Sequence, residues 1–187
     1  MSTTVAQLEM PQDCPIGPIT AGVTDAGVCM LTFRSLEDAQ DLIEDASKRT
    51  KTAAVHGEHP VLDQLQAELS AFFDGALTQF TVPIDAPGTT WESRVWNALR
   101  EIPFGTTTSY GEIARKLNNP GGSRAVGLAN GRNRVAILIP CHRVIASDGS
   151  LHGYASGLER KKWLLEHEQA VAGVETGLFG SCERTPS

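Results

Sequence analysis

The residues best suited to do chemistry are Cys141, His142 and Arg143, which are consecutive in the chain. A cysteine thiol has a pKa of about 8.5, and nearby cationic groups lower that pKa. A neighbouring histidine can serve as the base that removes the thiol proton. The pattern favours a nucleophilic cysteine, but a buried cysteine that only fills space in a core stays open as an alternative.

The residues around Cys141 must aim its side chain. Residues 135–139 (VAILI) form a short apolar run that favours a buried strand, and Pro140 then turns the chain into Cys141. A loop over residues 152–157 leads into a last amphipathic helix over residues 158–169. We therefore expect the strand to anchor the backbone and the turn at Pro140 and Cys141 to aim an exposed, ionised sulfur into a cleft.

Two short helices precede this strand. Ser109 and Glu112 form a capping box for the first of them, and residues 118–122 (NNPGG) form a turn. Ser123 is expected to cap the second, over residues 124–130. Two helices around a glycine-containing turn are typical of a helix-turn-helix, although a plain helical hairpin has the same signals.

The first half of the chain favours strands covered by helices. Residues 16–34 predict a β-hairpin, and Ser35 opens a capping box for a helix behind it. A second helix is expected from Pro60, and residues 80–84 are interpreted as a strand. Residues 86–88 (APG) then mark a boundary before the next helix.

Composition and charge narrow the function classes. The chain has 187 residues, of which 41% are hydrophobic and 20% charged, so wholesale disorder is excluded. Residues 1–88 hold 4 basic and 13 acidic side chains, whereas residues 89–168 hold 11 basic and 7 acidic ones. A basic segment in an acidic protein indicates a local polyanion-binding face, although scattered charge gives the same count. The acidic half argues against indiscriminate binding to nucleic acid.

The sequence also bears on the setting of the protein. It contains no apolar run long enough to span a bilayer and no secretory signal at its start. The cysteines, Cys14, Cys29, Cys141 and Cys182, are far apart, which argues against a disulfide framework. We expect a cytoplasmic protein, or a nuclear one in a eukaryote, with no membrane association.

Residues 139–144 (IPCHRV) resemble the signature of the methylated-DNA–protein-cysteine methyltransferases, also known as O6-alkylguanine-DNA alkyltransferases. The resemblance extends in order and spacing over about residues 88–170. It includes the segments 103–105 (PFG), 109–110 (SY), 124–127 (RAVG), 131–133 (GRN) and 166–168 (EHE).

This resemblance implies direct-reversal DNA repair. Cys141 would irreversibly accept a methyl or larger alkyl group from O6-alkylguanine, and also from O4-alkylthymine, in a single turnover. His142 would take the thiol proton through a bound water, and Glu168 would orient His142. Tyr110 would donate a proton or a hydrogen bond to the guanine oxygen. Asn133 would tie the end of the second short helix to the active-site strand.

The resemblance also implies how DNA is bound. The damaged base would be rotated out of the duplex, and Arg124 would fill the gap while its helix enters the minor groove. The expected DNA contacts are Arg124, Ala125, Gly127, Tyr110, Asn119 and Ser147. The expected lining of the base pocket is Tyr154, Val144 and Asn130.

Two segments depart from the family pattern. Arg134 stands where the family usually has a proline, which either loosens the entry to the active-site strand or adds a phosphate contact. Ala155 and Ser156 occupy a loop that is often richer in glycine. A bulkier loop would narrow the pocket for large alkyl groups.

The predicted fold class is α+β with two domains. Residues 1–87 are expected to form a small antiparallel-sheet domain, ribonuclease-H-like by resemblance and of unclear role. Residues 88–172 would form a mainly helical, DNA-binding and alkyl-accepting domain with the helix-turn-helix, and residues 173–187 a loose tail. The expected partner is double-stranded DNA that carries alkylated guanine, bound by a monomer.

We expect no cofactor and no metal, because His56, His59, Cys14 and Cys29 lack the spacing of a structural zinc site. Three alternatives stay open at this point. A non-catalytic sensor of alkylated DNA and a DNA-binding regulator would not need Cys141. A cysteine hydrolase would need an oxyanion-hole loop, for which the sequence shows no signature.

Overall fold

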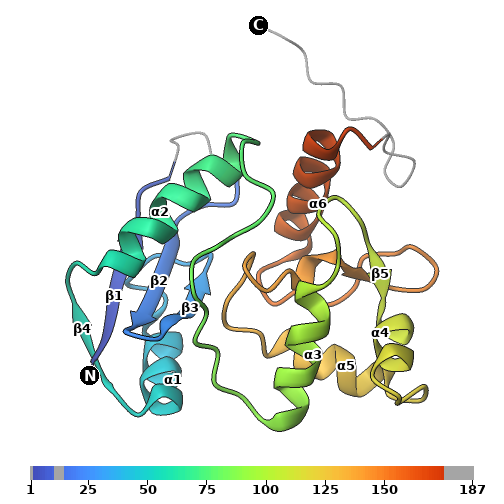
Figure 1. Cartoon of the computed structure of the whole chain (residues 1–187), viewed down its shortest axis with the longest axis horizontal. Helices are drawn as coiled ribbons and strands as arrows, with labels where there is room; N and C mark the ends of the chain where they lie inside the picture. Colours follow the sequence, from blue (N-terminus) through green and yellow to red (C-terminus); the bar gives the residue numbers. More distant parts are fainter. Residues whose placement is uncertain (1, 11–14, 175–187) are drawn as a thin grey trace, which may run out of the picture.

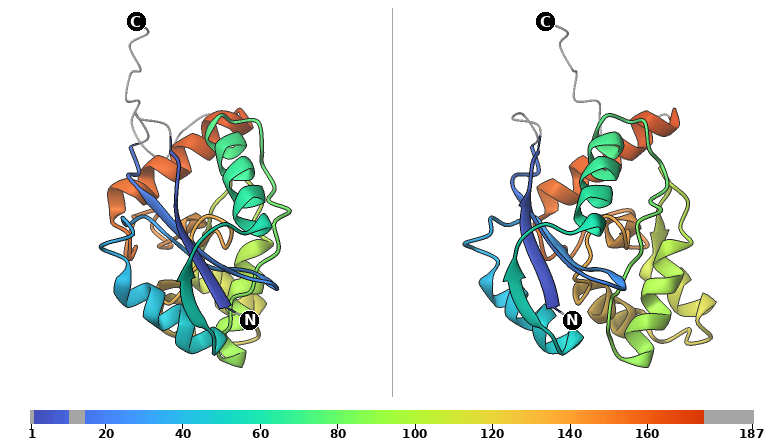
Figure 2. Two further views of the ribbon diagram at one scale, coloured as in Figure 1. Left: turned by 90° about the vertical axis from the view of Figure 1, so that its left-hand side faces the viewer. Right: turned by 60° about the vertical axis from the view of Figure 1, so that its left-hand side comes forward.

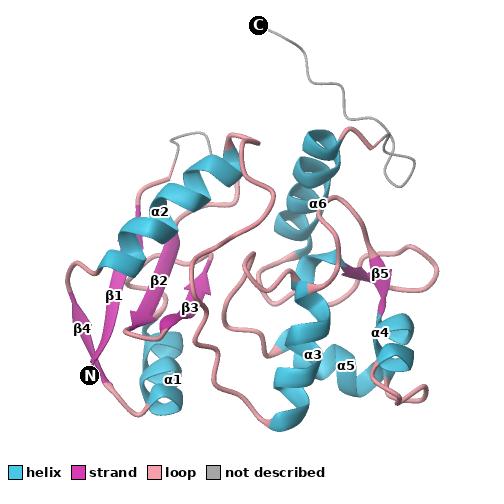
Figure 3. Cartoon of the chain, in the orientation of Figure 1, coloured by secondary structure: helices cyan, strands magenta, loops and turns pink. Residues whose placement is uncertain are grey.

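The computed structural model describes residues 2–10 and 15–174 and has a mixed α+β fold, which confirms the predicted class (Figure 1). Strands gather in the N-terminal half and helices dominate the C-terminal half (Figure 3). The elements in chain order are β1 (Ser2–Leu8), β2 (Ile19–Thr24), β3 (Gly27–Thr32), α1 (Gln40–Thr50), β4 (Ala53–His56), α2 (Pro60–Phe73), α3 (Thr90–Arg100), β5 (Thr108–Ser109), α4 (Tyr110–Lys116), α5 (Ser123–Gly131), the 3₁₀ turn η1 (Cys141–Arg143), β6 (Val144–Ile145) and α6 (Leu158–Ala172).

The N-terminal sheet has the strand order β3-β2-β1-β4. The predicted hairpin is confirmed as the antiparallel pair β2 and β3. The expectation of a purely antiparallel sheet is wrong, because β4 pairs with β1 in parallel. All four residues of β4 are exposed, so no alternation of apolar and polar side chains signals this strand in the sequence.

Helices cover both faces of the sheet. Ile43 and Ala46 of α1 pack with Val5 and Met30 in one apolar cluster. The predicted face of α2 packs in a second, larger cluster that also contains residues of α3, α5 and α6. Figure 2 shows α2 on the side of the sheet that faces these helices. The larger cluster therefore links the sheet to the helical half of the chain.

The predicted strand over residues 80–84 is wrong. Only Ile84 forms a bridge, with Val28 at the edge of β3. The carbonyl of Pro83 accepts a hydrogen bond from the Val28 amide at 2.8 Å. Pro83 has no amide hydrogen to donate to a ladder, which explains why this segment touches the sheet edge without extending it.

The predicted active-site strand over residues 135–139 is also wrong. Val135 forms a single bridge with Leu31, and the chain then enters a turn in which Ile137 has a φ of 68°. All five residues are buried. The apolar run thus reflects burial against the sheet and the helices, which a turn inside the core demands as much as a strand does.

Two predicted helix caps are wrong. Ser35 accepts a hydrogen bond from the Asp38 amide at 3.1 Å, but this bond closes a turn ahead of α1, which begins at Gln40. Ser123 is the first residue of α5 and makes no capping bond there. The capping box of Ser109 and Glu112 is confirmed, because each residue accepts a hydrogen bond from the other's amide.

Helices α4 and α5 are joined by residues 117–122 and are anchored on α3. The indole Nε1 of Trp96 donates to the Ala129 carbonyl at 2.9 Å, and that of Trp91 donates to the Ala125 carbonyl at 3.2 Å. These bonds hold one side of α5 against α3.

Among the described residues, no helix is long and apolar enough to cross a membrane. Cys14, Cys182 and residues 175–187 of the predicted tail lie outside the described residues.

Candidate active site and DNA-binding face

Cys141 opens the turn η1, which follows the buried segment 135–139 and leads into β6. Its side chain is almost fully buried, at 6% exposure. The amide Nδ2 of Asn133 donates to the Cys141 sulfur at 3.1 Å and to the Ile139 carbonyl at 2.9 Å, while Asn133 Oδ1 accepts from the Val135 amide. Asn133 therefore connects the end of α5 to the segment that carries Cys141, as the family resemblance implied.

The expectation of an exposed, ionised sulfur is wrong for the free protein. Burial raises the pKa of the Cys141 thiol above its usual value. The hydrogen bond from Asn133, the charge of Lys161 and the Tyr154 hydroxyl each act in the opposite direction. The resting thiol is thus protonated at neutral pH, among groups that stabilise the thiolate once a base removes the proton.

His142 and Glu168 form a fully buried pair. The His142 Nε2 atom lies 2.8 Å from Glu168 Oε1, and neither side chain is exposed. Burial lowers the pKa of His142, so its ring is neutral at neutral pH. A neutral ring that donates through Nε2 keeps a lone pair on Nδ1, and His142 Nδ1 has no hydrogen-bond partner among the described residues. The predicted pairing of these two residues is therefore present, with Nδ1 as the free basic atom.

Arg143, to which the sequence analysis gave no separate role, completes this cluster. Its guanidinium donates to both oxygens of Glu168, at 2.8 and 2.9 Å, and to the Ile102 carbonyl at 2.7 Å. The Gly105 amide adds a fourth bond to Glu168 at 3.2 Å. Burial by itself would raise the pKa of Glu168, but the bonds from His142 and Arg143 lower it to about 2. Glu168 is thus a fixed negative charge behind His142.

Lys161 is a functional residue that the sequence pattern did not indicate. It lies on α6 with no exposed surface, and its Nζ donates to the carbonyls of Val144 at 2.7 Å and His152 at 3.2 Å. Burial lowers its pKa to about 8. Its charge favours the Cys141 thiolate. A lysine on an amphipathic helix usually lies in solvent, so the pattern alone gave no reason to place it inside.

Acid is expected to destabilise this cluster. Because the folded-state pKa of Glu168 lies at about 2, below its ordinary 4.5, its contribution is complete above pH 4.5 and is lost as the pH falls towards 2. The lowered pKa of His142 acts in the same direction below its ordinary pKa of 6.5. Urea unfolding at a series of pH values should show the wild-type protein losing about 3 kcal/mol more than Glu168→Gln between pH 4.5 and 2. If the free energies of unfolding of wild type and Glu168→Gln fell in parallel with pH, the depressed pKa of Glu168 would be contradicted.

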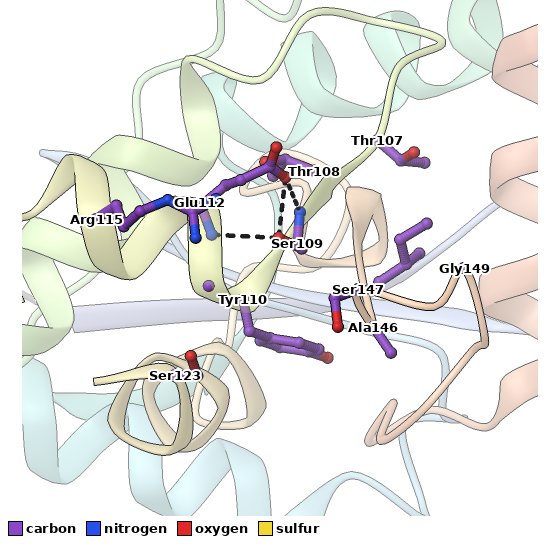
Figure 4. Close-up of a pocket in the computed structure, with 12 residues that line it drawn as sticks. Thr107, Thr108, Ser109, Tyr110, Glu112, Arg115, Ser123, Ala146, Ser147 and Gly149 are labelled. Carbon is purple, nitrogen blue, oxygen red and sulfur yellow. Dashed lines mark hydrogen bonds between the residues drawn. The ribbon is translucent and has the colours of Figure 1, made fainter. Parts of the chain in front are cut away.

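A broad groove of about 710 Å³ lies beside α4. Figure 4 shows the Tyr110 ring, at the start of α4, extending towards Ala146 and Ser147. Ser123, at the start of α5, lines the same groove. Burial, and then proximity to Cys141, raise the pKa of Tyr110, so its hydroxyl keeps its proton. The groove therefore brings two predicted DNA contacts, Tyr110 and Ser147, together, and Tyr110 is close enough to Cys141 for its pKa to respond to the sulfur.

The other predicted DNA contacts lie on or before α5. Arg124, Ala125 and Asn119 are exposed, and Gly127 is half-buried. Gly127 lies next to Tyr110, because a Cβ atom added there would be 3.9 Å from the tyrosine ring. Arg124 makes no hydrogen bond or ion pair among the described residues, and α5 presents it on the side away from Val126 and Ala129, which are buried.

The three predicted base-pocket residues surround Cys141 but do not line the groove. Val144 and Asn130 are buried, and Asn130 Nδ2 lies 3.5 Å from the Cys141 carbonyl. The Tyr154 hydroxyl is buried near the Cys141 sulfur, and burial holds its pKa well above the usual value. These three residues therefore lie directly around Cys141.

Comparisons with known proteins define the class to which this site belongs. Residues 90–170 match the family model described as "6-O-methylguanine DNA methyltransferase, DNA binding domain". A methylated-DNA–protein-cysteine methyltransferase of Mycobacterium tuberculosis is 44% identical over 167 residues, which cover 89% of this chain and 95% of the relative. One of Methanosarcina acetivorans is 41% identical over 160 residues, covering 83% and 94%.

The solved structures agree with the sequence comparisons. The crystal structure of Mycobacterium tuberculosis OGT in complex with DNA superposes with a TM-score of 0.73 at 41% identity, and the match covers 90% of this chain and 94% of that one. The chain belongs to the family of methylated-DNA–protein-cysteine methyltransferases. The predicted resemblance is thereby confirmed.

Proposed function

We propose that this protein repairs alkylated DNA by transferring a methyl group from O6-methylguanine in a duplex to its own Cys141. The observation that carries the proposal is the buried cluster in which Cys141 lies against Asn133 and is followed directly by His142, itself bonded to Glu168. A sensor or a regulator on the same scaffold would not need this cluster. Family membership supports the same reaction.

The reaction is a displacement at a saturated carbon. His142 Nδ1 takes the thiol proton, through a water molecule as the family resemblance implies, and Glu168 balances the positive charge that forms on the ring. The sulfur lone pair then forms the bond to the methyl carbon while the bond from that carbon to guanine O6 breaks. The oxygen that leaves takes up a proton, for which Tyr110 is the donor. O4-alkylthymine presents the same kind of carbon.

A thioether at Cys141 does not hydrolyse, so each molecule reacts once. Titration of the protein with an excess of duplex that carries O6-methylguanine tests this point. Repaired guanine should accumulate to one equivalent per protein and then stop. Continued turnover beyond one equivalent, or no repair, would overturn the proposed function.

The DNA-binding part of the proposal concerns α4 and α5. These helices and their turn act as a helix-turn-helix, with α5 in the minor groove and Arg124 in the gap left by the extruded base. Exposure of Arg124 and Ala125 on α5, and of Asn119 in the turn before it, supports this placement. We further propose that a ribonuclease-H-like sheet domain precedes a separate DNA-binding domain, and that the protein works as a monomer in the cytoplasm.

Replacing Arg124 by alanine should slow repair of a methylated duplex by about ten- to a hundredfold, because nothing then offsets the cost of unstacking the damaged base. Methyl transfer from free O6-methylguanine should change by less than about twofold, since no base pair has to open. Arg100→Ala is the matched control: this arginine is also exposed but lies at the end of α3. An equal loss on both substrates would rule out the assigned role of Arg124.

A further inference from the structure

The turn that carries Cys141 is docked on the edge strand of the N-terminal sheet. The Leu31 amide of β3 donates to the Arg134 carbonyl at 2.7 Å, and the Ala136 amide donates to the Leu31 carbonyl at 3.1 Å. Further along the turn, Ile137 has a φ of 68°, in the left-handed region that β-branched residues avoid. A strained, irregular segment persists only where its surroundings hold it. Part of that support comes from outside the helical half of the chain.

The side chain of Arg134 provides a second connection to the N-terminal part. Its Nε atom donates to Asp45 Oδ2 on α1 at 2.9 Å. The same oxygen accepts from Arg49 Nε at 2.9 Å, and Arg49 also donates to the Pro87 carbonyl at 3.3 Å. Asp45 and Arg134 are each about one third exposed at the side chain. The two arginines lower the pKa of Asp45 although burial opposes this, so the carboxylate is charged at neutral pH.

Arg134 directly follows Asn133, the residue whose amide contacts the Cys141 sulfur at 3.1 Å. A shift of the backbone at residue 134 therefore changes the position of the Asn133 amide relative to the Cys141 sulfur. Asn133 is also the only one of the two neighbours that touches the cysteine: the described bonds of Arg134 all lead to the N-terminal part. The two adjacent residues thus face opposite ways, one towards the sheet and one towards the nucleophile.

We propose that Asp45 and Arg134 are positioning residues for the alkyl-transfer reaction, through which the N-terminal part of the chain holds Asn133 against the Cys141 sulfur. The inference rests on the proposed function. It gives the N-terminal part a role in preparing the nucleophile, because a hydrogen-bond donor at fixed distance stabilises the thiolate that attacks. It also gives Arg134 a specific task in place of the phosphate contact considered from the sequence.

The other titratable groups around the sulfur come from other elements. Lys161 approaches from α6, Tyr154 from the preceding loop, Tyr110 from α4 and His142 from η1. Asp45 and Arg134 form no hydrogen bond with any of these four among the described residues. A change at the ion pair therefore reaches the sulfur through Asn133. The signature of such a change is a shift in the pH dependence of methyl transfer.

The test uses Asp45→Asn, Arg134→Gln, the double variant and wild type, each as the full chain. The probe is free O6-methylguanine, which removes any contribution from DNA binding, and methyl transfer is followed by intact mass from neutral to alkaline pH. Both single variants should react about fivefold more slowly at neutral pH, the effect of one weakened hydrogen bond, with the profile displaced to higher pH. The double variant should be no slower than either single one.

Arg49→Gln is the matched control, because it removes the other cation on Asp45 but leaves Arg134 paired. The thermal unfolding midpoint of Arg49→Gln should fall, as we expect for Asp45→Asn and Arg134→Gln. Its rate of methyl transfer and its pH profile should equal those of wild type. Arg134→Lys keeps the cation and should recover part of the rate, even if Arg134→Gln fails to fold. Unchanged rates and pH profiles in the test variants, or additive losses in the double variant, would overturn the proposal. Absence of transfer in wild type would instead overturn the proposed function.

Discussion

Cys141→Ser is expected to abolish methyl transfer completely. A serine hydroxyl has the size to fit the buried position, but it is far less acidic than a thiol and a much poorer nucleophile towards a saturated carbon. After incubation with a methylated duplex, the variant should keep its starting mass, while wild type gains one methyl group in place of one proton. Binding to the duplex should persist, since the residues of α5 that we propose to contact DNA are untouched.

Cys29→Ser provides the matched control for this result. Cys29 is also buried, but it lies in β3, its sulfur donates to the Gly22 carbonyl at 3.3 Å, and burial raises its pKa to about 11. Met30, not a histidine, follows it in the chain, and no side-chain amide of the described residues donates to its sulfur. This variant should gain the full methyl mass. A gain in Cys141→Ser, or its loss in Cys29→Ser, would show that the acceptor has been misassigned.

Glu168→Gln is expected to have the second largest effect. Glutamine keeps the shape of the side chain but removes the negative charge to which Arg143 and His142 are bonded. The buried guanidinium then lacks a counter-ion, which should lower the free energy of unfolding by about 3 kcal/mol. His142 also loses the charge that fixes its tautomer and stabilises its protonated form. Methyl transfer should slow by about a hundredfold, the usual size of a general-base contribution.

The effect on rate must be separated from the effect on stability. Methyl transfer should be measured on protein that is folded by circular dichroism, at a temperature well below the unfolding midpoint. Glu166→Gln is the control on the same helix, because its carboxylate makes only a loose 3.8 Å pair with Lys162. It should behave as wild type in both measurements. A folded Glu168→Gln protein that reacts at the wild-type rate would contradict the role given to Glu168.

Much of the regular structure could be predicted because it follows from periodicity and capping. The apolar face of α2, the hairpin of β2 and β3, and the box of Ser109 and Glu112 are local patterns, and each is present in the fold. The prediction of a strand over residues 135–139 was wrong, because an apolar run indicates only that a segment is buried. The turn is closed by hydrogen bonds from the Leu138 amide to the Ala136 carbonyl and from the Ile139 amide to the Val135 carbonyl, with Ile137 at a positive φ, and neither feature is visible in an apolar run.

The candidate site divides in a similar way. Cys141 and His142 are adjacent and were visible in the sequence, and Glu168 came from the family resemblance. The ion pair of Arg143 with Glu168 and the burial of Lys161 were not predicted, because both depend on the tertiary fold, in which Arg143 donates to the Ile102 carbonyl and Lys161 to the Val144 carbonyl. The raised pKa of Cys141 was missed for the same reason, since the desolvation that causes it arises only when the core closes around the sulfur.

The most direct test of the account is to locate the transferred methyl group. Wild-type protein is incubated with a duplex that carries O6-methylguanine, digested, and sequenced by tandem mass spectrometry. We expect one methyl group on the peptide that contains Cys141, assigned to the sulfur of that residue, with an equal amount of guanine restored in the DNA. Restored guanine without methylated Cys141, or a methyl group on another residue, would contradict it.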